Sequence, residues 1–283
     1  MKARKAVFAG SWYPDSATEC EREIKAFIKE AKVKAGITSK LTGGIVPHAG
    51  WYYSGSIACN VIKALSESSA PDVFLIFGMH LHTGSPSYIM KDGAWETPFG
   101  EIEIKGDISS ELAKKYPFEI ETPQKFTRDN TIELQLPFIK YFFKDAKIVP
   151  IGVPPVKESF DIGRDAAKIA TNLGLKVMVL GSTDLTHYGV NYGFVSHGTG
   201  DSAVNWVKNE NDKRVIDAML EMDPGKVIKE ALSNDNACCA GAAATAISAA
   251  KEIGASNAEL VTYTTSYDIS PADSFVGYAG IIF

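Results

Sequence analysis

The chain has 283 residues, of which 45% are hydrophobic and 22% are charged. This composition supports one large hydrophobic core and excludes a disordered, collagenous or disulfide-framework protein. The formal net charge is -5, from 29 basic and 34 acidic residues scattered along the chain, so nucleic acid is not expected as a partner.

Strand-like apolar runs alternate with segments of helical periodicity along the chain. Strands are expected near 44–47, 73–77, 101–105, 147–152, 176–180, 259–264 and 275–282. Helices are expected near 17–33, 55–67, 130–143, 158–173, 201–221, 225–232 and 238–253. This order predicts an α/β protein with a mixed, mostly parallel central sheet and helices on both faces. The runs 73–77 and 177–180 are apolar at every position, which is typical of central strands.

Two helix boundaries carry additional signals. Asp223 can cap a helix that has Pro224 at its first position. Gly254 follows the expected helix 238–253, at the position where a residue with a left-handed backbone conformation commonly ends a helix. The chain shows no internal repeat and no long polar linker. We therefore expect a single domain over residues 1–283.

The cysteines and the amino terminus indicate a reducing compartment. The four cysteines have no C-x-x-C spacing, and the first residues lack the apolar region of a signal peptide. No apolar run approaches the ~20 residues that a membrane-spanning helix needs. We expect a cytoplasmic protein without a membrane partner, and a homo-oligomer is compatible with the sequence.

Four of the five histidines follow strand-like runs within a few residues: His48, His80, His82 and His187. Ligands of open α/β sheets bind outside the carboxyl ends of the strands. Imidazole is the commonest metal ligand and readily transfers protons near neutral pH. These histidines therefore indicate a site, although a core or capping role suits each of them as well. His197 follows no apolar run and is interpreted as a loop residue.

His80 and His82 flank Leu81 after an unusually apolar strand. An extended chain would place both rings on the same side, whereas an immediate turn after Gly78 would let only one reach a metal. The sequence pattern alone leaves both arrangements open.

Asp184 precedes His187 by three residues, a spacing that brings the side chains together if the turn is helical. A carboxylate that orients an imidazole is the usual arrangement of a general base or of a metal ligand with its supporting partner. The alternative is an aspartate that caps a helix beside an incidental histidine.

Cys238 stands at the expected amino end of the 238–253 helix, where the helix dipole favours a thiolate. Cys239 would point about 100° away on the same helix, so we expect the two not to share one role. Either can also be a small buried hydrophobic residue. Cys20 and Cys59 fall in other helices and are expected to be structural.

Two histidines with a carboxylate are the ligands of non-haem iron oxygenases, whereas a thiolate shifts the preference toward softer or redox-active ions. The chain lacks H-E-x-x-H, G-x-S-x-G, G-x-G-x-x-G and a Walker P-loop. Zincin protease, α/β-hydrolase, dinucleotide-binding and P-loop functions therefore have no motif support.

Several blocks, in order over nearly the whole chain, resemble the Memo family, in prokaryotes also called protein B of the AmmeMemoRadiSam system. The blocks are Ala9–Pro14, Pro47–Trp51, His82–Gly84, Trp95–Pro98, Ile132–Pro137, Ser182–Tyr188 and Ala237-Cys238. The resemblance implies a fold similar to that of class III extradiol, non-haem iron dioxygenases. It also implies metal ligation by His48, by the histidine after the second strand and by Cys238, with Asp184 and His187 close by.

The sequence departs from the family pattern in three places. The turn Gly78–Gly84 is one residue longer than usual, and we favour His82 as the ligand because Thr83-Gly84 follows it, with His80 as the alternative. Asn130 replaces a histidine, and Cys239 replaces a glycine. In the related dioxygenases a glutamate occupies the place of Cys238 and the counterpart of His187 is the acid/base residue.

Two functions follow as expectations. In the first, iron(II), or else copper or zinc, is held by His48, His82 and Cys238, and His187, oriented by Asp184, moves protons in a metal-dependent oxidoreductase. In the second, the protein is a non-enzymatic metal or redox protein, or it binds a peptide or partner protein in the pocket that corresponds to the active site of the dioxygenases. The aromatic residues expected to contact an organic ligand lie in these blocks or next to one of them: Trp12, Tyr13, Trp51, Tyr52 and Tyr188.

Overall fold

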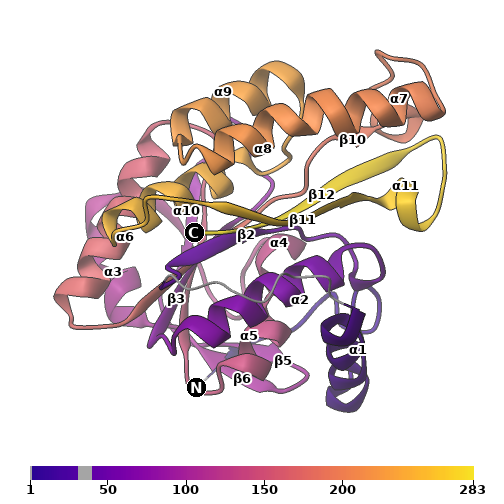
Figure 1. Cartoon of the computed structure of the whole chain (residues 1–283). Coiled ribbons are helices and arrows are strands. Elements are labelled where there is room, and N and C mark those ends of the chain that lie inside the picture. The colour runs from indigo at the N-terminus through magenta and orange to yellow at the C-terminus, as the bar shows by residue number, and fades with distance from the viewer. Residues whose placement is uncertain (1, 31–39) are drawn as a thin grey trace.

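The central element of the fold is a nine-stranded mixed sheet between two layers of helices (Figure 1). The structure is a computed structural model, and it describes residues 2–30 and 40–283. The strands lie in the order β10-β12-β2-β9-β3-β8-β4-β7, and β11 pairs with β12. Their bounds are β2 Gly43–Val46, β3 Val73–Gly78, β4 Ser87–Met90, β7 Phe118–Glu121, β8 Lys147–Gly152, β9 Val177–Ser182, β10 His187–Tyr188, β11 Glu259–Thr265 and β12 Phe275–Ile282.

The middle of the sheet is parallel, as the apolar runs predict. β2 pairs with β9, β9 with β3 and β3 with β8, all in parallel, whereas β12 pairs with β2 and β4 with β8 in antiparallel fashion. Along β3, Leu75 and Phe77 face one hydrophobic cluster, and Phe74 and Ile76 face another. A strand that buries both of its faces must be covered by helices on both sides, so the predicted fold class is confirmed.

Helices α3, α6, α8, α9 and α10 lie on one side of the sheet, and α1, α2 and α5 lie on the other (Figure 1). Their bounds are α1 Ala17–Glu30, α2 Trp51–Ser68, α3 Gly106–Lys115, α4 Asn130–Glu133, α5 Leu136–Phe142, α6 Glu158–Asn172, α7 Asp201–Trp206, α8 Asp212–Leu220, α9 Pro224–Asn234, α10 Ala240–Glu252 and α11 Ser266–Ile269. A short 3-10 turn spans Val190–Tyr192, and a π-helical turn, Val207–Asn211, joins α7 to α8. Within the described ranges, no helix combines the length and apolar character needed to cross a membrane.

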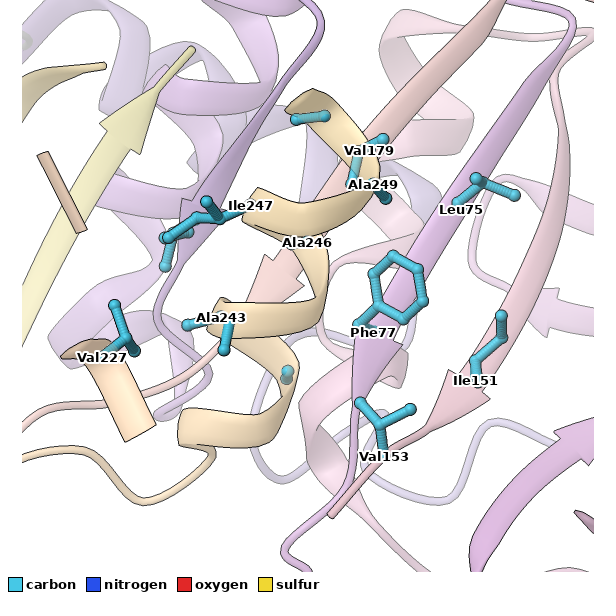
Figure 2. Close-up of a cluster of buried hydrophobic side chains, with 14 of the residues drawn as sticks. Leu75, Phe77, Ile151, Val153, Val179, Val227, Ala243, Ala246, Ile247 and Ala249 are labelled. Carbon is cyan, nitrogen blue, oxygen red and sulfur yellow. The ribbon is translucent and has the colours of Figure 1, made fainter. Parts of the chain in front are cut away.

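The alanine-rich helix α10 packs very closely on β9 and β3 (Figure 2). A Cβ atom added to Gly181 of β9 would lie 2.8 Å from the Cβ atom of Ala246. Small residues on both elements therefore permit this close approach, and Figure 2 shows α10 lying across the strands that carry Val179 and Phe77. The packing fixes the position of the residues that precede α10.

Most of the expected elements are present with shifted ends. Asp223 caps α9 by accepting a hydrogen bond from the Lys226 amide, and Gly254 has a φ of 101° after α10, so both helix signals are confirmed. The predicted helix 130–143 is divided into α4 and α5, and the part of the predicted helix 17–33 beyond Glu30 lies outside the described residues.

A second sheet of three short strands was not expected. It has the order β1-β5-β6, with β1 at Ala3–Arg4, β5 at Ala94–Thr97 and β6 at Gly100–Glu103. The buried guanidinium of Arg4 lies 3.7 Å from the ring centroid of Trp95 and forms an ion pair with Glu121. β6 corresponds to the strand expected near 101–105, whereas β1 and β5 were not expected because strands of two and four residues leave little alternation for the sequence pattern to reveal.

Candidate metal centre

Three adjacent parallel strands end at the same edge of the sheet, and the candidate site lies beyond that edge. β2, β9 and β3 end at Val46, Ser182 and Gly78. His48, Asp184 and His80 each follow one of these ends by two residues. The expected convergence at the carboxyl ends of the strands is therefore confirmed for these three residues.

Four metal-ligating side chains meet beyond these strand ends. One ligand atom from each of His48, His80, Cys238 and Cys239 lies within 4.8 Å of every other. The Nε2 atoms of His48 and His80 are 3.2 Å apart, and Cys238 Sγ is 3.3 Å from His48 Nε2. Helix α10, packed on β9 and β3, brings the cysteines to the histidines.

The ring of His48 is oriented by Ser182. The Ser182 hydroxyl donates to the Thr131 carbonyl at 2.7 Å, so it accepts from His48 Nδ1, at 3.0 Å. The proton of a neutral His48 ring is thereby assigned to Nδ1, and Nε2 keeps its lone pair. His48 is buried, with 1% of its surface exposed, so this arrangement directs Nε2 to the cluster.

Asp129, which sequence reasoning missed, orients His80 in the same way. Its Oδ2 atom accepts from the His80 amide at 3.0 Å and from His80 Nδ1 at 2.9 Å. A carboxylate cannot donate, so Nδ1 carries the proton and Nε2 is free. This carboxylate–histidine pair is the usual support of a metal-ligating imidazole.

The geometry of the two histidines fits a shared cation. Two unprotonated Nε2 atoms at 3.2 Å repel each other unless a proton or a metal ion lies between them. Burial opposes the charged form of His80, but Asp129 and Cys238 outweigh it and raise the pKa of His80 to about 10. Burial likewise opposes the charged form of His48, yet Asp184 and Cys238 raise its pKa. The pocket therefore stabilises positive charge at the Nε2 atoms.

The thiol of Cys238 is stabilised as a thiolate. Burial opposes its ionisation, but the Cys239 thiol and the two imidazoles outweigh burial and hold the pKa of Cys238 well below its usual range. The helix begins later than predicted, at Ala240, with Cys239 at the N-cap. The two thiols are consequently not about 100° apart around a helix: their sulfurs are 3.7 Å apart. The helical geometry on which we based separate roles for the two cysteines is therefore wrong, and the roles themselves stay a prediction.

His82 does not reach this cluster, so the preference for it over His80 is corrected. His82 lies in the exposed turn after β3, where its Nδ1 accepts from the Gly84 amide at 3.2 Å. The chain reverses at Met79, whose φ of 74° is left-handed, and the Met79 amide donates to Thr131 Oγ1 at 2.7 Å. This turn directs His80 to His48 and carries His82 away.

Asp184 and His187 lie at the site, but not as the orienting pair that their spacing suggests. Asp184 Oδ1 accepts from the His48 amide at 2.7 Å, so its carboxylate fixes the turn that carries His48. His187 Nδ1 is 3.1 Å from the Leu185 carbonyl, which can only accept. A backbone carbonyl, rather than Asp184, therefore orients the His187 ring and leaves its Nε2 free. Burial raises the pKa of Asp184, opposed by His48.

A cavity of about 490 Å³ opens directly on these side chains. His48, His80, Asp184 and His187 contribute to its wall, and Asn130 does so while its amide donates to the His48 carbonyl at 2.8 Å. Its aromatic lining is Trp12, Tyr52, Tyr53, Tyr192 and Tyr278. Tyr13, Trp51 and Tyr188, which were also expected as pocket walls, are buried in the core instead.

Cys20 and Cys59 are buried within α1 and α2, as expected for structural cysteines. Burial raises the pKa of each thiol to about 12. Neither belongs to the cluster of ligand atoms. Burial and the neighbouring Cys238 also raise the pKa of Cys239, so Cys238 is the one cysteine among the described residues whose pKa is lowered.

The chain is similar to known proteins over its whole length. A sequence model described as Memo-like protein matches residues 4–282. MEMO1 family proteins of Pyrococcus furiosus and Thermococcus onnurineus are each 36% identical to it, over 289 and 290 residues; each alignment covers 99% of this chain and 98% or 99% of the relative. A crystal structure of an uncharacterised Escherichia coli protein has a TM-score of 0.50 and 10% identity, covering 80% of this chain and 91% of that one, which supports the fold alone.

Proposed function

The chain belongs to the family of Memo-like proteins, and we propose that it binds one transition-metal ion through His48, His80 and Cys238. The observation that carries this proposal is the pair of Nε2 atoms 3.2 Å apart, each freed for a ligand by a hydrogen bond at Nδ1. Two imidazoles and a thiolate are ligands that iron, copper and zinc accept.

Metal analysis of anaerobically prepared protein tests this function. The full chain is loaded separately with iron(II), copper(I) and zinc, dialysed and analysed for bound metal. We expect one equivalent in the wild type and loss of binding in His48→Ala and Cys238→Ser. Wild-type protein that retains none of the three ions would contradict the proposal.

The cavity supports a metal-dependent oxidoreductase acting on a small organic molecule. Its volume of about 490 Å³ lies within the range of small-molecule sites, and five tyrosine and tryptophan side chains contribute to its wall. A bound ion such as iron(II) would supply Lewis-acid and redox chemistry at the cavity floor. The tyrosine and tryptophan rings would bind and orient an aromatic substrate and exclude water from it.

His187 would move the proton in this reaction. Its Nδ1 donates to the Leu185 carbonyl, so Nε2 is the nitrogen left to accept a proton from a hydroxyl group of a molecule in the cavity. Asp184 would act by holding the His48 turn rather than by contacting the substrate.

A second function, holding a metal without turnover, is favoured by the thiols. A thiolate at the site favours softer ions than those used for oxygen activation by two histidines and a carboxylate. Oxygen consumption with a panel of catechols separates the two functions. Turnover that is lost in His187→Ala, with metal content unchanged, supports the oxidoreductase, whereas bound metal without turnover supports metal holding.

A further inference from the structure

Cys239 places a second sulfur atom beside the donors of the proposed metal site. Its Sγ is 3.7 Å from Cys238 Sγ, and all four donor atoms lie within 4.8 Å of one another. Consecutive residues can aim their thiols in the same direction here because α10 begins only at Ala240, and Cys239 has the non-helical dihedrals φ -126° and ψ 52°.

The backbone of this cysteine pair is tied to the segment after β9. The Cys238 amide donates to the Asp184 carbonyl at 3.2 Å, and the Cys239 amide donates to Thr183 Oγ1 at 3.0 Å. Asp184 in turn accepts from the His48 amide. The sulfurs and the imidazole of His48 are therefore held by one hydrogen-bonded unit, which leaves little freedom in the donor positions.

We propose that Cys239 is a fourth ligand, so that the ion is enclosed by His48, His80, Cys238 and Cys239. This inference rests on the proposed metal-binding function and adds to it the number and kind of the ligands. It would turn a site with an open position into a closed one, because a tetrahedral ion with four protein ligands has no place for substrate or oxygen.

The distances between the donors carry this inference. For a tetrahedral ion with bonds of about 2.05 Å to nitrogen and 2.3 Å to sulfur, the nitrogens lie about 3.3 Å apart, nitrogen and sulfur about 3.5 Å, and the sulfurs about 3.8 Å. The corresponding separations in the structure are 3.2, 3.3 and 3.7 Å. These three of the six edges agree with the tetrahedral values to about 0.2 Å. The other three, which include both edges from Cys239 to the histidines, lie within 4.8 Å.

Two thiolates change the metal preference. Thiolate-rich tetrahedral sites suit zinc and copper(I), whereas iron(II) oxygenases use imidazole, carboxylate and open positions. On binding a divalent ion, Cys239 would release its thiol proton to the solvent, whereas Cys238 already favours the thiolate. The inference therefore favours the metal-holding function over oxygen activation.

X-ray absorption of the zinc-loaded full chain counts the sulfurs directly. We expect two sulfur and two nitrogen neighbours in the wild type, and one sulfur in Cys239→Ser, in which serine can still serve as the N-cap of α10. Cys59→Ala, which removes a buried thiol in α2, is the matched control and should keep two sulfurs. Zinc affinity, measured by chelator competition, should fall by more than about 100-fold in Cys239→Ser, since even supporting partners of ligands contribute 10- to 100-fold.

The outcomes separate this inference from the function on which it rests. One sulfur neighbour in the wild type, with an unchanged affinity in Cys239→Ser, overturns the fourth ligand and leaves the metal site standing. No zinc binding by the wild type overturns both. The number of sulfur neighbours in the wild type tests the fourth ligand even if Cys239→Ser fails to fold.

Discussion

The Nε2 atoms of His48 and His80 face each other at 3.2 Å, although the two residues follow different strands and are 32 positions apart. Each ring donates its Nδ1 proton to a fixed acceptor, the hydroxyl of Ser182 or the carboxylate of Asp129. Both Nε2 atoms are thus left free for the proposed ion by residues outside the donor set, and changes to Ser182 or Asp129 should alter the affinity for that ion.

Asp129→Asn should lower metal affinity by about 10- to 100-fold, which is the usual effect of a lost partner behind a ligating histidine. The amide cannot accept from both the His80 amide and Nδ1 while also accepting from the Thr131 amide, as the carboxylate does. Its NH₂ group would favour the His80 tautomer with the proton on Nε2, which cannot ligate. Chelator competition measures the affinity.

The fold should survive this change because asparagine caps helices about as well as aspartate, and Asp129 caps α4. Circular dichroism and the urea midpoint of Asp129→Asn serve as the control. An affinity equal to that of the wild type would show that Asp129 does not support a ligand.

His80→Ala and His82→Ala should have opposite results. His80 lies in the cluster of donor atoms, and His82 lies in an exposed turn with its Nδ1 bonded to the Gly84 amide. We expect the first variant to lose more than about 100-fold in metal affinity, more than a supporting partner contributes, and the second to retain wild-type affinity. Isothermal titration with zinc compares them directly, and the reverse result would restore His82 as the ligand.

This pair of histidines shows how far the sequence alone could lead. Apolar runs predict β2, β3 and β9, and thereby the edge where His48, Asp184 and a histidine of the turn after β3 converge. The choice between His80 and His82 depends on the left-handed φ of Met79, a non-glycine residue for which that conformation is rare. Local sequence carries no signal for such a turn.

The supporting residues were missed for a different reason. Asp129 is 49 positions from His80, and its place behind the imidazole follows from the packing of α4 against β3 rather than from any spacing. Asp129 caps α4 through Oδ1, and a helix cap predicts nothing about the contact that its Oδ2 makes with His80. Cys239 was not expected to share a role with Cys238, because the helix was expected to begin at 238 rather than at Ala240.

Asp212→Asn should change how stability depends on pH. Asp212 is buried at the start of α8, where Oδ1 accepts from the Thr186 amide at 3.0 Å and Oδ2 from the Tyr263 hydroxyl at 2.7 Å. Burial outweighs these hydrogen bonds and raises its pKa to about 6. Because the unfolded carboxyl titrates near pH ~4, the folded state binds the extra proton between pH ~4 and ~6, and the stability from this group is lost as pH rises through that window.

The asparagine side chain has no such titration. The free energy of unfolding of the wild type, relative to the variant, should therefore fall by about 3 kcal/mol between pH ~4 and ~7. Urea unfolding at several pH values measures this difference. Asp217→Asn, at a less buried position of the same helix, is the control, and parallel profiles for wild type and Asp212→Asn would refute the prediction.

Gly241→Ala should destabilise the fold and weaken metal binding together. Gly241 lies in the first turn of α10, and an added Cβ would lie 2.5 Å from the Val153 carbonyl oxygen and from the Pro154 carbonyl carbon. Both are backbone atoms, and the Pro154 carbonyl is itself fixed by the Ser159 hydroxyl at 2.7 Å, so the helix must move instead. Alanine gains about 1 kcal/mol of helix propensity, but such overpacking typically costs 1–3 kcal/mol net.

A shift of α10 would also carry Cys238 away from the histidines, so zinc affinity should fall in step with the urea midpoint. Gly225→Ala is the matched control because it lies on the exposed first turn of α9, where the nearest atom to an added Cβ is Asp223 Oδ1 at 3.4 Å. That variant should gain about 0.5–1 kcal/mol and bind zinc as the wild type does. If Gly241→Ala were as stable as Gly225→Ala, the close contact of α10 with the Val153–Pro154 segment could not be what positions the thiols.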